Sequence, residues 1–89
     1  MDYIYTVKLT NFRDADVHFV LEPWGEQYIM SPKASFVIVA SAPLQGELEI
    51  EVDEKRIVVY GWSGSVVQLF QDGNNVGGST QPVPPLPRM

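Results

Sequence analysis

Apolar and polar positions alternate with a period of two along most of the chain, as in strands with one buried and one solvated face. The clearest run is residues 47–53, where Glu47, Glu49 and Glu51 alternate with aliphatic residues. A helix would spread these acids around its circumference, and no segment has helical periodicity of useful length. The pattern predicts an all-β fold in which these carboxylates point to water and their aliphatic neighbours to the core.

Seven segments are rich in β-branched and aromatic residues and are separated by Gly or Pro, which predicts seven strands. They are Tyr3–Leu9, Ala15–Glu22, Glu26–Met30, Ala34–Ser41, Glu47–Asp53, Lys55–Trp62 and Ser65–Gln71. Such short strands are typical of a small antiparallel β-sandwich or a flattened barrel, and we expect a Greek-key sandwich.

The inward-facing residues follow from the alternation. Val17, Phe19 and Leu21 are expected to face the core, with His18 outward. Residues 34–41 are apolar at nearly every position, which predicts a central strand covered on both faces.

Two hairpins are predicted among the last three strands. Residues 47–53 would pair with residues 56–62 through Glu54-Lys55, which sets Val52 opposite Ile57. Residues 55–62 would pair with residues 65–71 through Ser63-Gly64, where glycine suits a tight turn. The second register sets Tyr60 opposite Val67, Val58 opposite Leu69 and Ile57 opposite Phe70. One face of this sheet is then core, with the residues Leu48, Ile50, Val52, Ile57, Val59, Val66 and Phe70.

The opposite face of these hairpins is the candidate interaction surface, because it combines apolar and aromatic residues with the glutamate row. Its residues are Tyr60, Trp62, Val58, Val67 and Leu69, and Trp24 is a further candidate. Trp24 lies in the corner Pro23-Trp24-Gly25, where it is expected to plug an open end of the fold or, alternatively, to stack on a ligand. A monomer rarely leaves such a patch uncovered, so either the N-terminal strands or the tail cover it, or it binds a protein partner or a second copy, which is the outcome we expect. The alternative is a small carbohydrate-binding domain that uses exposed aromatic rings.

Composition narrows the functional classes. The chain has 89 residues, enough for one domain, and a net charge of −5 with six scattered Lys and Arg residues. We expect no nucleic-acid binding, since this needs a clustered basic surface. Cysteine is absent, and we recognise neither a signal peptide nor an apolar run of membrane-spanning length. We therefore expect a soluble, cytoplasmic protein.

No residues are predicted to be catalytic, to hold a cofactor or to bind a metal. His18 is the only histidine, and no serine–histidine–acid set accompanies it. One His without Cys does not supply the ligands of a blue-copper or structural zinc site. Asp72-Gly73-Asn74-Asn75 is better explained as a turn than as a calcium loop. The glutamates of residues 47–51 have the spacing of some glycosidase carboxylates, yet as solvated groups they lack the burial that a general acid requires.

The end of the chain has a different composition. Residues 1–76 are expected to form the folded domain, and residues 77–89 a flexible tail. This tail begins with Gly77-Gly78-Ser79 and continues as a proline-rich segment that favours polyproline II. Its last residues, Pro84-Pro85-Leu86-Pro87-Arg88, are similar to ligands of SH3-type domains, although the basic residue is displaced by one position.

Several short motifs carry a resemblance to known proteins. They are Thr10-Asn11-Phe12, Leu21-Glu22-Pro23-Trp24-Gly25, Pro32, Phe36-Val37-Ile38-Val39-Ala40 and Val59-Tyr60-Gly61-Trp62. Their order resembles small uncharacterised bacterial all-β proteins, and the layout is similar to cupredoxin-like sandwiches. The copper ligands of cupredoxins are missing, so the resemblance implies architecture alone. We expect a non-enzymatic interaction, accessory or scaffold module.

Overall fold

The structure, a computed structural model, describes residues 2–84 and contains eight β-strands in two sheets. The described residues contain no helix. The strands are β1 (Tyr3–Thr10), β2 (Val17–Glu22), β3 (Glu26–Met30), β4 (Ser35–Ala42), β5 (Glu49–Val52), β6 (Arg56–Tyr60), β7 (Val66–Gln71) and β8 (Asn74–Ser79). The all-β prediction is confirmed, and each of the seven predicted strands is found within two residues of its predicted ends.

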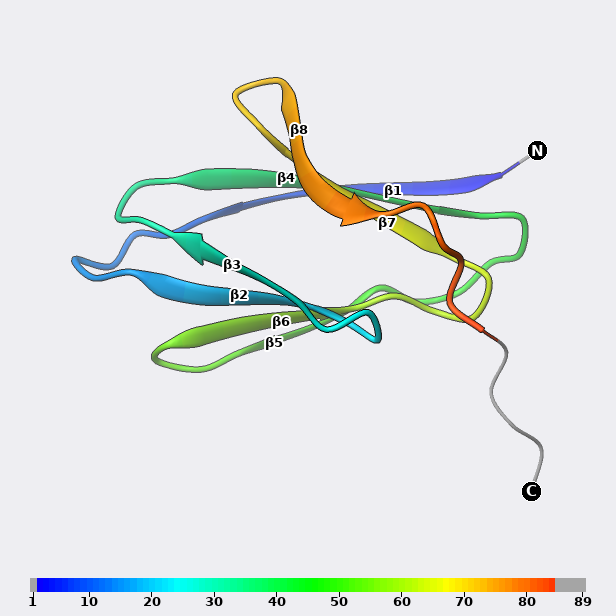
Figure 1. Cartoon of the computed structure of the whole chain (residues 1–89), viewed down its shortest axis with the longest axis horizontal. Helices are drawn as coiled ribbons and strands as arrows, with labels where there is room; N and C mark the ends of the chain where they lie inside the picture. Colours follow the sequence, from blue (N-terminus) through cyan, green and yellow to red (C-terminus); the bar gives the residue numbers. More distant parts are fainter. Residues whose placement is uncertain (1, 85–89) are drawn as a thin grey trace.

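The strands divide into two four-stranded layers (Figure 1). Sheet I has the order β1-β4-β7-β8 and is antiparallel throughout. Sheet II has the order β3-β2-β6-β5. Its central pair, β2 and β6, is parallel, with Val20 beside Val58. The prediction of a purely antiparallel fold is therefore wrong at this pair, which joins strands far apart in the sequence.

The hydrophobic core lies between the two sheets and is centred on Phe19 of β2. The ring of Phe19 meets Phe36 of β4 edge to face at 5.2 Å, and Tyr28 of β3 packs against both rings at 6.3 Å. The buried cluster draws on both layers and comprises Val17, Phe19, Leu21, Met30, Phe36, Ile38, Ala40, Ile57, Val59, Val67 and Leu69. The inward orientation predicted for β2 is confirmed, because Val17, Phe19 and Leu21 are buried and His18 is exposed.

The predicted hairpin of β5 and β6 is confirmed in its register. Ile50 pairs with Val59 and Val52 with Ile57. The glutamates at 47, 49 and 51 are exposed, while Leu48 and Ile50 pack against the core. Val52 was predicted to be buried but is 61% exposed, because β5 ends there at the edge of sheet II.

The second predicted hairpin is wrong, because β6 and β7 belong to different sheets. β6 already has β2 and β5 as neighbours, so β7 pairs instead with β4 and β8. Val67 and Leu69 consequently point into the core with no exposed surface. Val66 and Phe70, predicted to be buried, are only half-buried and alternate with the core residues of β7.

The prediction for β4 is correct about its position and incomplete about its burial. β4 lies between β1 and β7, as expected for a central strand. Its inward residues, which include Phe36 and Ile38, are buried, but the alternate residues of the strand are only half-buried. One face of β4 is therefore covered by the core and the other is partly open to solvent.

β8 was not predicted from the sequence, and it includes residues 77–79 of the predicted flexible tail. Gly77 and Gly78 are needed here because neighbouring atoms lie too close to their backbone for a side chain. A Cβ atom on Gly77 would lie 2.2 Å from the Tyr28 hydroxyl, and one on Gly78, whose φ is +104°, would lie 2.4 Å from the Val67 carbonyl oxygen. Residues 85–89 of the predicted tail lie outside the described residues, as does most of its SH3-ligand-like motif.

Candidate interaction surface

The residues of the predicted interaction surface do not lie together. Val67 and Leu69 are core residues of sheet I, so they are excluded from any surface. Val58 and Tyr60 lie on the outer face of sheet II beside a small hollow with Glu51 and Arg56, but Val58 is only 7% exposed and offers little surface. The prediction of this surface assumed that β7 lies beside β6, whereas β2 occupies that position.

Trp62 packs within the chain. Its indole N–H donates to the Leu44 carbonyl at 3.0 Å, and its ring meets Tyr5 edge to face at 5.4 Å. Gly46 lies against the five-membered ring of the indole, since a Cβ there would overlap Trp62 Cδ1. Trp62 is half-buried, and its hydrogen bond and ring contacts explain it as a structural residue.

Trp24 also has intramolecular contacts. Its indole N–H donates to the Gln81 carbonyl at 2.9 Å. The segment that contains Gln81 continues to Val83, whose N–H donates to Ser65 O and whose carbonyl accepts from Gly64 N. The half-buried Trp24 thus closes one end of the fold beneath residues 81–83, in agreement with its predicted role as a plug.

The outer face of sheet II carries an uneven distribution of charge. His18 and Arg56 are paired at one end of the β2–β6 ladder, Val20 and Val58 at its middle, and Glu22 and Tyr60 at the other end. Hydrogen bonding to Glu51 and burial, with the nearby Glu22 and Glu49 charges, raise the pKa of Tyr60 above its ordinary value. The end of the face at Glu22 and Tyr60 is therefore acidic.

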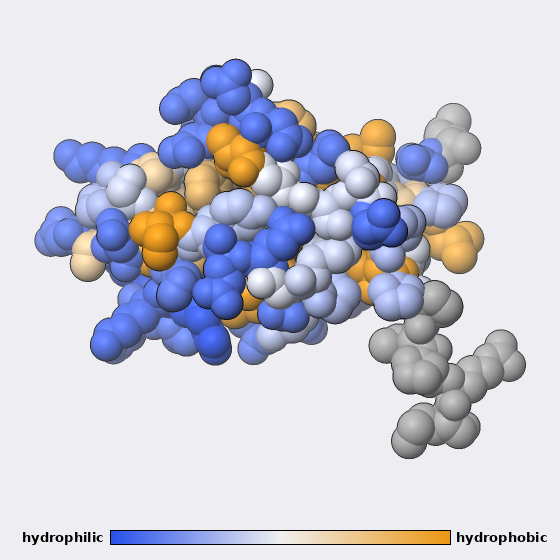
Figure 2. Space-filling model, in the orientation of Figure 1, coloured by the Kyte–Doolittle hydropathy of each residue, from blue (hydrophilic) through white to orange (hydrophobic). Residues whose placement is uncertain are grey.

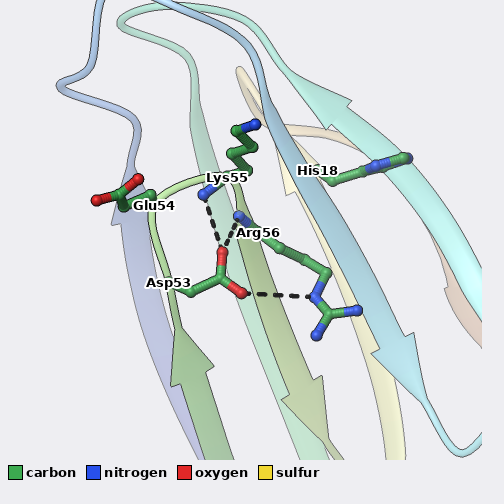
Figure 3. Close-up of a pocket in the computed structure, with 5 residues that line it drawn as sticks. All are labelled: His18, Asp53, Glu54, Lys55 and Arg56. Carbon is green, nitrogen blue, oxygen red and sulfur yellow. Dashed lines mark hydrogen bonds and ion pairs between the residues drawn. The ribbon is translucent and has the colours of Figure 1, made fainter.

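An open hollow of about 450 Å³ lies at the opposite end, around the β5–β6 turn. His18, Asp53, Glu54, Lys55 and Arg56 line it (Figure 3). The Asp53 carboxylate accepts hydrogen bonds from the backbone N–H groups of Lys55 and Arg56, both at 2.8 Å, and its other oxygen lies 3.9 Å from Arg56 Nε. These contacts make Asp53 the residue that fixes the turn. Its side chain takes the role that glycine has in the usual tight hairpin.

The contacts of Asp53 predict a pH dependence of the turn. The hydrogen bond from Lys55 N–H contributes most, and the Arg56 N–H and charge add to it, so the pKa of Asp53 falls below its ordinary value of 3.8. Since the folded-state pKa lies below the unfolded one, Asp53 stabilises the fold at neutral pH, and this contribution is lost as the pH falls through the folded-state pKa.

We expect Asp53→Asn to lower the unfolding free energy at pH 7, and the difference from wild type to shrink towards pH 2. Chemical unfolding curves between pH 2 and 7 measure this, with Asp14→Asn in the exposed β1–β2 loop as control. A difference that is constant with pH would contradict this role.

This hollow offers little to a catalytic or metal-binding mechanism. In the part of the chain that the structure describes, no three His, Asp or Glu residues are grouped so as to hold a metal ion. The two acids and two bases that line the hollow balance in charge, and Asp53 is already engaged in the turn. The contacts of Asp53 therefore explain the hollow as part of the turn.

Most of the exposed hydrophobic residues are on or next to two edge strands, β1 of sheet I and β5 of sheet II. We call this the β1–β5 side, and residues of both strands line one hollow there. Two of its residues are on β1, one is on the β1–β2 loop, one is on the β4–β5 loop near Trp62 and one is on β5. They are Tyr3, Ile4, Phe12, Leu44 and Val52, five of the seven large hydrophobic residues that are exposed among the described residues.

Phe12 is the most exposed of these residues, at 87%. It borders a hollow of about 280 Å³ whose apolar lining includes Leu9 of β1, Val52 of β5 and Ile57 of β6. The loop that holds Phe12 is anchored on both sides: the Asn11 side chain bonds to Ala15 O and Met30 O, and the Arg13 guanidinium donates to Glu54 O. An aromatic ring is thus held in water beside an apolar hollow by a fixed loop.

The opposite side of the molecule looks different. β8 and β3 lie at the front in Figure 1, and the same view in Figure 2 shows small hydrophobic patches separated by hydrophilic residues. Scattered apolar residues of this kind are normal on a protein surface. The β1–β5 side is the candidate because two of its exposed apolar residues, Phe12 and Val52, line a hollow.

Sequence reasoning placed Phe12 in a motif but gave it no surface role. The available signal was a lone aromatic residue in the polar run Asn11-Phe12-Arg13-Asp14. The edge position of β1 had no comparable signal, because it depends on which strands pair.

Two further findings bear on the class of protein. No helix in residues 2–84 has the length and apolar character needed to cross a membrane. Comparison of the chain with protein-family models, curated proteins and solved structures finds no match.

Proposed function

We propose that this chain is a non-enzymatic protein-interaction module that binds a protein partner through the β1–β5 side. The observation that carries the proposal is the ring of Phe12, 87% exposed on an anchored loop beside an apolar hollow. Interfaces are commonly centred on an aromatic residue packed near a partner pocket, and contiguous apolar surface on a monomer marks such sites.

We further infer that the two sheets form a sandwich and not a flattened barrel, since no ladder of the described strands joins one sheet to the other. A Greek-key connection and the cupredoxin-like resemblance stay predictions, as does the cytoplasmic location.

The carbohydrate-binding alternative has no specific observation in its favour. Trp24 and Trp62, its proposed stacking residues, donate their indole N–H groups to carbonyls of the same chain.

Phe12→Ser tests the proposed function. We expect the wild-type chain to retain one or more protein partners in an affinity purification, and Phe12→Ser to retain them at least about tenfold less, since loss of an anchor residue costs 2 kcal/mol or more, about a 30-fold change in affinity. Ile29→Ser is the matched control, because Ile29 is also exposed (57%) but lies on β3, away from the β1–β5 side. Quantitative mass spectrometry measures the recovery of each partner. Equal recovery with Phe12→Ser and wild type would overturn the proposal.

A further inference from the structure

The free edge of β1 differs from the other three sheet edges. β1 has eight residues, and no described strand pairs with its outer side. β5 has four residues, two of them glutamates, and β3 has five. β8 contains two glycines and pairs with β7 through a register shift at Leu69/Phe70. Short length, charges and bulges are the devices that keep sheet edges from pairing. β1 has only one charge, Lys8, and no proline or glycine, so its edge is open to another strand.

The direction of the free hydrogen-bonding groups follows from the ladder with β4. The N–H of Asn11 donates to Ala34 O, which continues the register of β1 and β4. Because hydrogen-bonded positions alternate along an antiparallel pair, the odd-numbered residues of β1 direct their backbone groups towards β4. Ile4, Thr6 and Lys8 direct theirs towards the free edge. These three side chains are also exposed.

We infer that β1 pairs antiparallel with β1 of a second copy of this chain about a two-fold axis at Thr6, which joins the two copies of sheet I into one continuous sheet. The inference goes beyond the proposed function, because Phe12 follows β1 and lies outside the paired positions. The two-fold keeps both sheets II on the same side. Tyr5 then lies opposite Val7 of the second copy, and the inward apolar residues of the two β1 strands form one continuous row.

An axis at Thr6 or at Val7 pairs β1 with its copy over the greatest length, and charge complementarity selects between these two registers. With the axis at Thr6, Lys8 faces Ile4 of the second copy and lies diagonally across from the position of Asp2. Asp2 is exposed and directly precedes β1, and the alternation of β1 continued by one residue puts it on the face of Lys8. Diagonal positions on one face are about 7–8 Å apart, within reach of a lysine. The symmetry makes this unlike-charge contact twice. An axis shifted to Val7 would instead place the two Lys8 side chains diagonally across from each other, where like charges repel.

A cysteine at the axis tests the pairing directly, because the chain contains no cysteine of its own. Opposed residues of a hydrogen-bonded pair have Cα atoms about 5.5 Å apart, which a disulfide can span. We expect Thr6→Cys to form a disulfide-linked dimer under mild oxidation at micromolar concentration, at least tenfold faster than Gln27→Cys. Gln27 is a matched exposed position on the edge strand β3. Equal rates for the two variants would overturn the inference.

A charge exchange tests the register without a covalent bond. We expect light scattering to show a dimer of the wild-type chain, and Asp2→Lys or Lys8→Asp to raise its dissociation constant at least threefold each. The double variant restores the unlike pair and should return to within about twofold of wild type. A strictly monomeric wild-type chain, or a double variant no better than the singles, would overturn the inference. If the chain is monomeric but a partner still depends on Phe12, the proposed function stands and only this inference fails.

Discussion

Replacing Phe19 by alanine is expected to lower the free energy of unfolding by about 3–5 kcal/mol. Phe19 has no exposed surface and lies at the centre of the core, in ring contact with Phe36 of sheet I and Tyr28 of sheet II. Its removal leaves a cavity between the layers that neither sheet can fill without breaking ladder hydrogen bonds. Domains of this size have roughly 4–13 kcal/mol of stability in total, so the variant should be close to unfolding at room temperature.

Urea unfolding followed by tryptophan fluorescence measures this effect. Phe12→Ala is the matched control, since it removes the same atoms at an exposed position and should change stability by no more than about 0.5 kcal/mol. Phe19→Leu keeps most of the volume and should cost less than Phe19→Ala, which keeps the test informative if the alanine variant does not fold. Similar losses for Phe19→Ala and Phe12→Ala would contradict the packing described here.

Replacing Asn11 is expected to have the second largest effect. Asn11 is only 3% exposed, and its side chain donates to Ala15 O at 2.9 Å and to Met30 O at 3.0 Å while accepting from Arg13 N–H at 3.0 Å. Asn11→Ala leaves three backbone groups without this partner, and each buried unsatisfied group costs about 1–3 kcal/mol. We expect a loss of about 2–4 kcal/mol, against at most about 0.5 kcal/mol for Asn75→Ala at an exposed position.

Asn11→Asp separates the hydrogen-bonding role from the volume of the side chain. An ionised carboxylate cannot donate to two carbonyl oxygens, and its burial beside them raises its pKa in the folded state. The variant should therefore be less stable than Asn11→Ala at pH 7 and should regain stability as the pH falls towards the unfolded-state pKa of about 3.9. Unfolding curves between pH 4 and 7 measure this. A stability that does not change with pH relative to wild type would contradict the proposed geometry.

Asn11 also connects stability to the proposed surface. Its side chain holds the loop in which Phe12 is exposed, so a variant that loosens this loop should weaken partner binding as well as folding. This link explains why a buried polar residue adjoins the most exposed aromatic residue of the described chain.

Local sequence patterns determined the strands and many of their faces. The alternation in residues 47–53 places the glutamates outward because burial of a charged carboxylate without a partner is costly, and the adjoining turn then fixes the register of β5 with β6. The cost of burying polar groups also bears on β7. Val66 and Phe70 were predicted to face the core, and the polar Gln68 lies on the same face between them, whereas the observed core face carries Val67 and Leu69.

Two misjudged segments show where local reasoning fails. Residues 74–79 have the composition of a loop, yet they form β8 because β7 offers a free edge and Gly77 leaves room for the Tyr28 ring. The turn at Ser63-Gly64 has the composition of a hairpin loop, yet the chain there crosses from sheet II to sheet I.

The sequence by itself determined that this protein is built of strands, where most of them begin and end, and which side chains of β2 and β5 face the solvent, because these follow from period and side-chain solvation within one segment. Only the tertiary structure decided that β2 lies beside β6, that β1 is a sheet edge, and that Phe12 borders an apolar hollow next to Val52. Pairing between distant strands depends on the combined packing of all of them, and the sequence of a single strand does not specify which strands lie beside it.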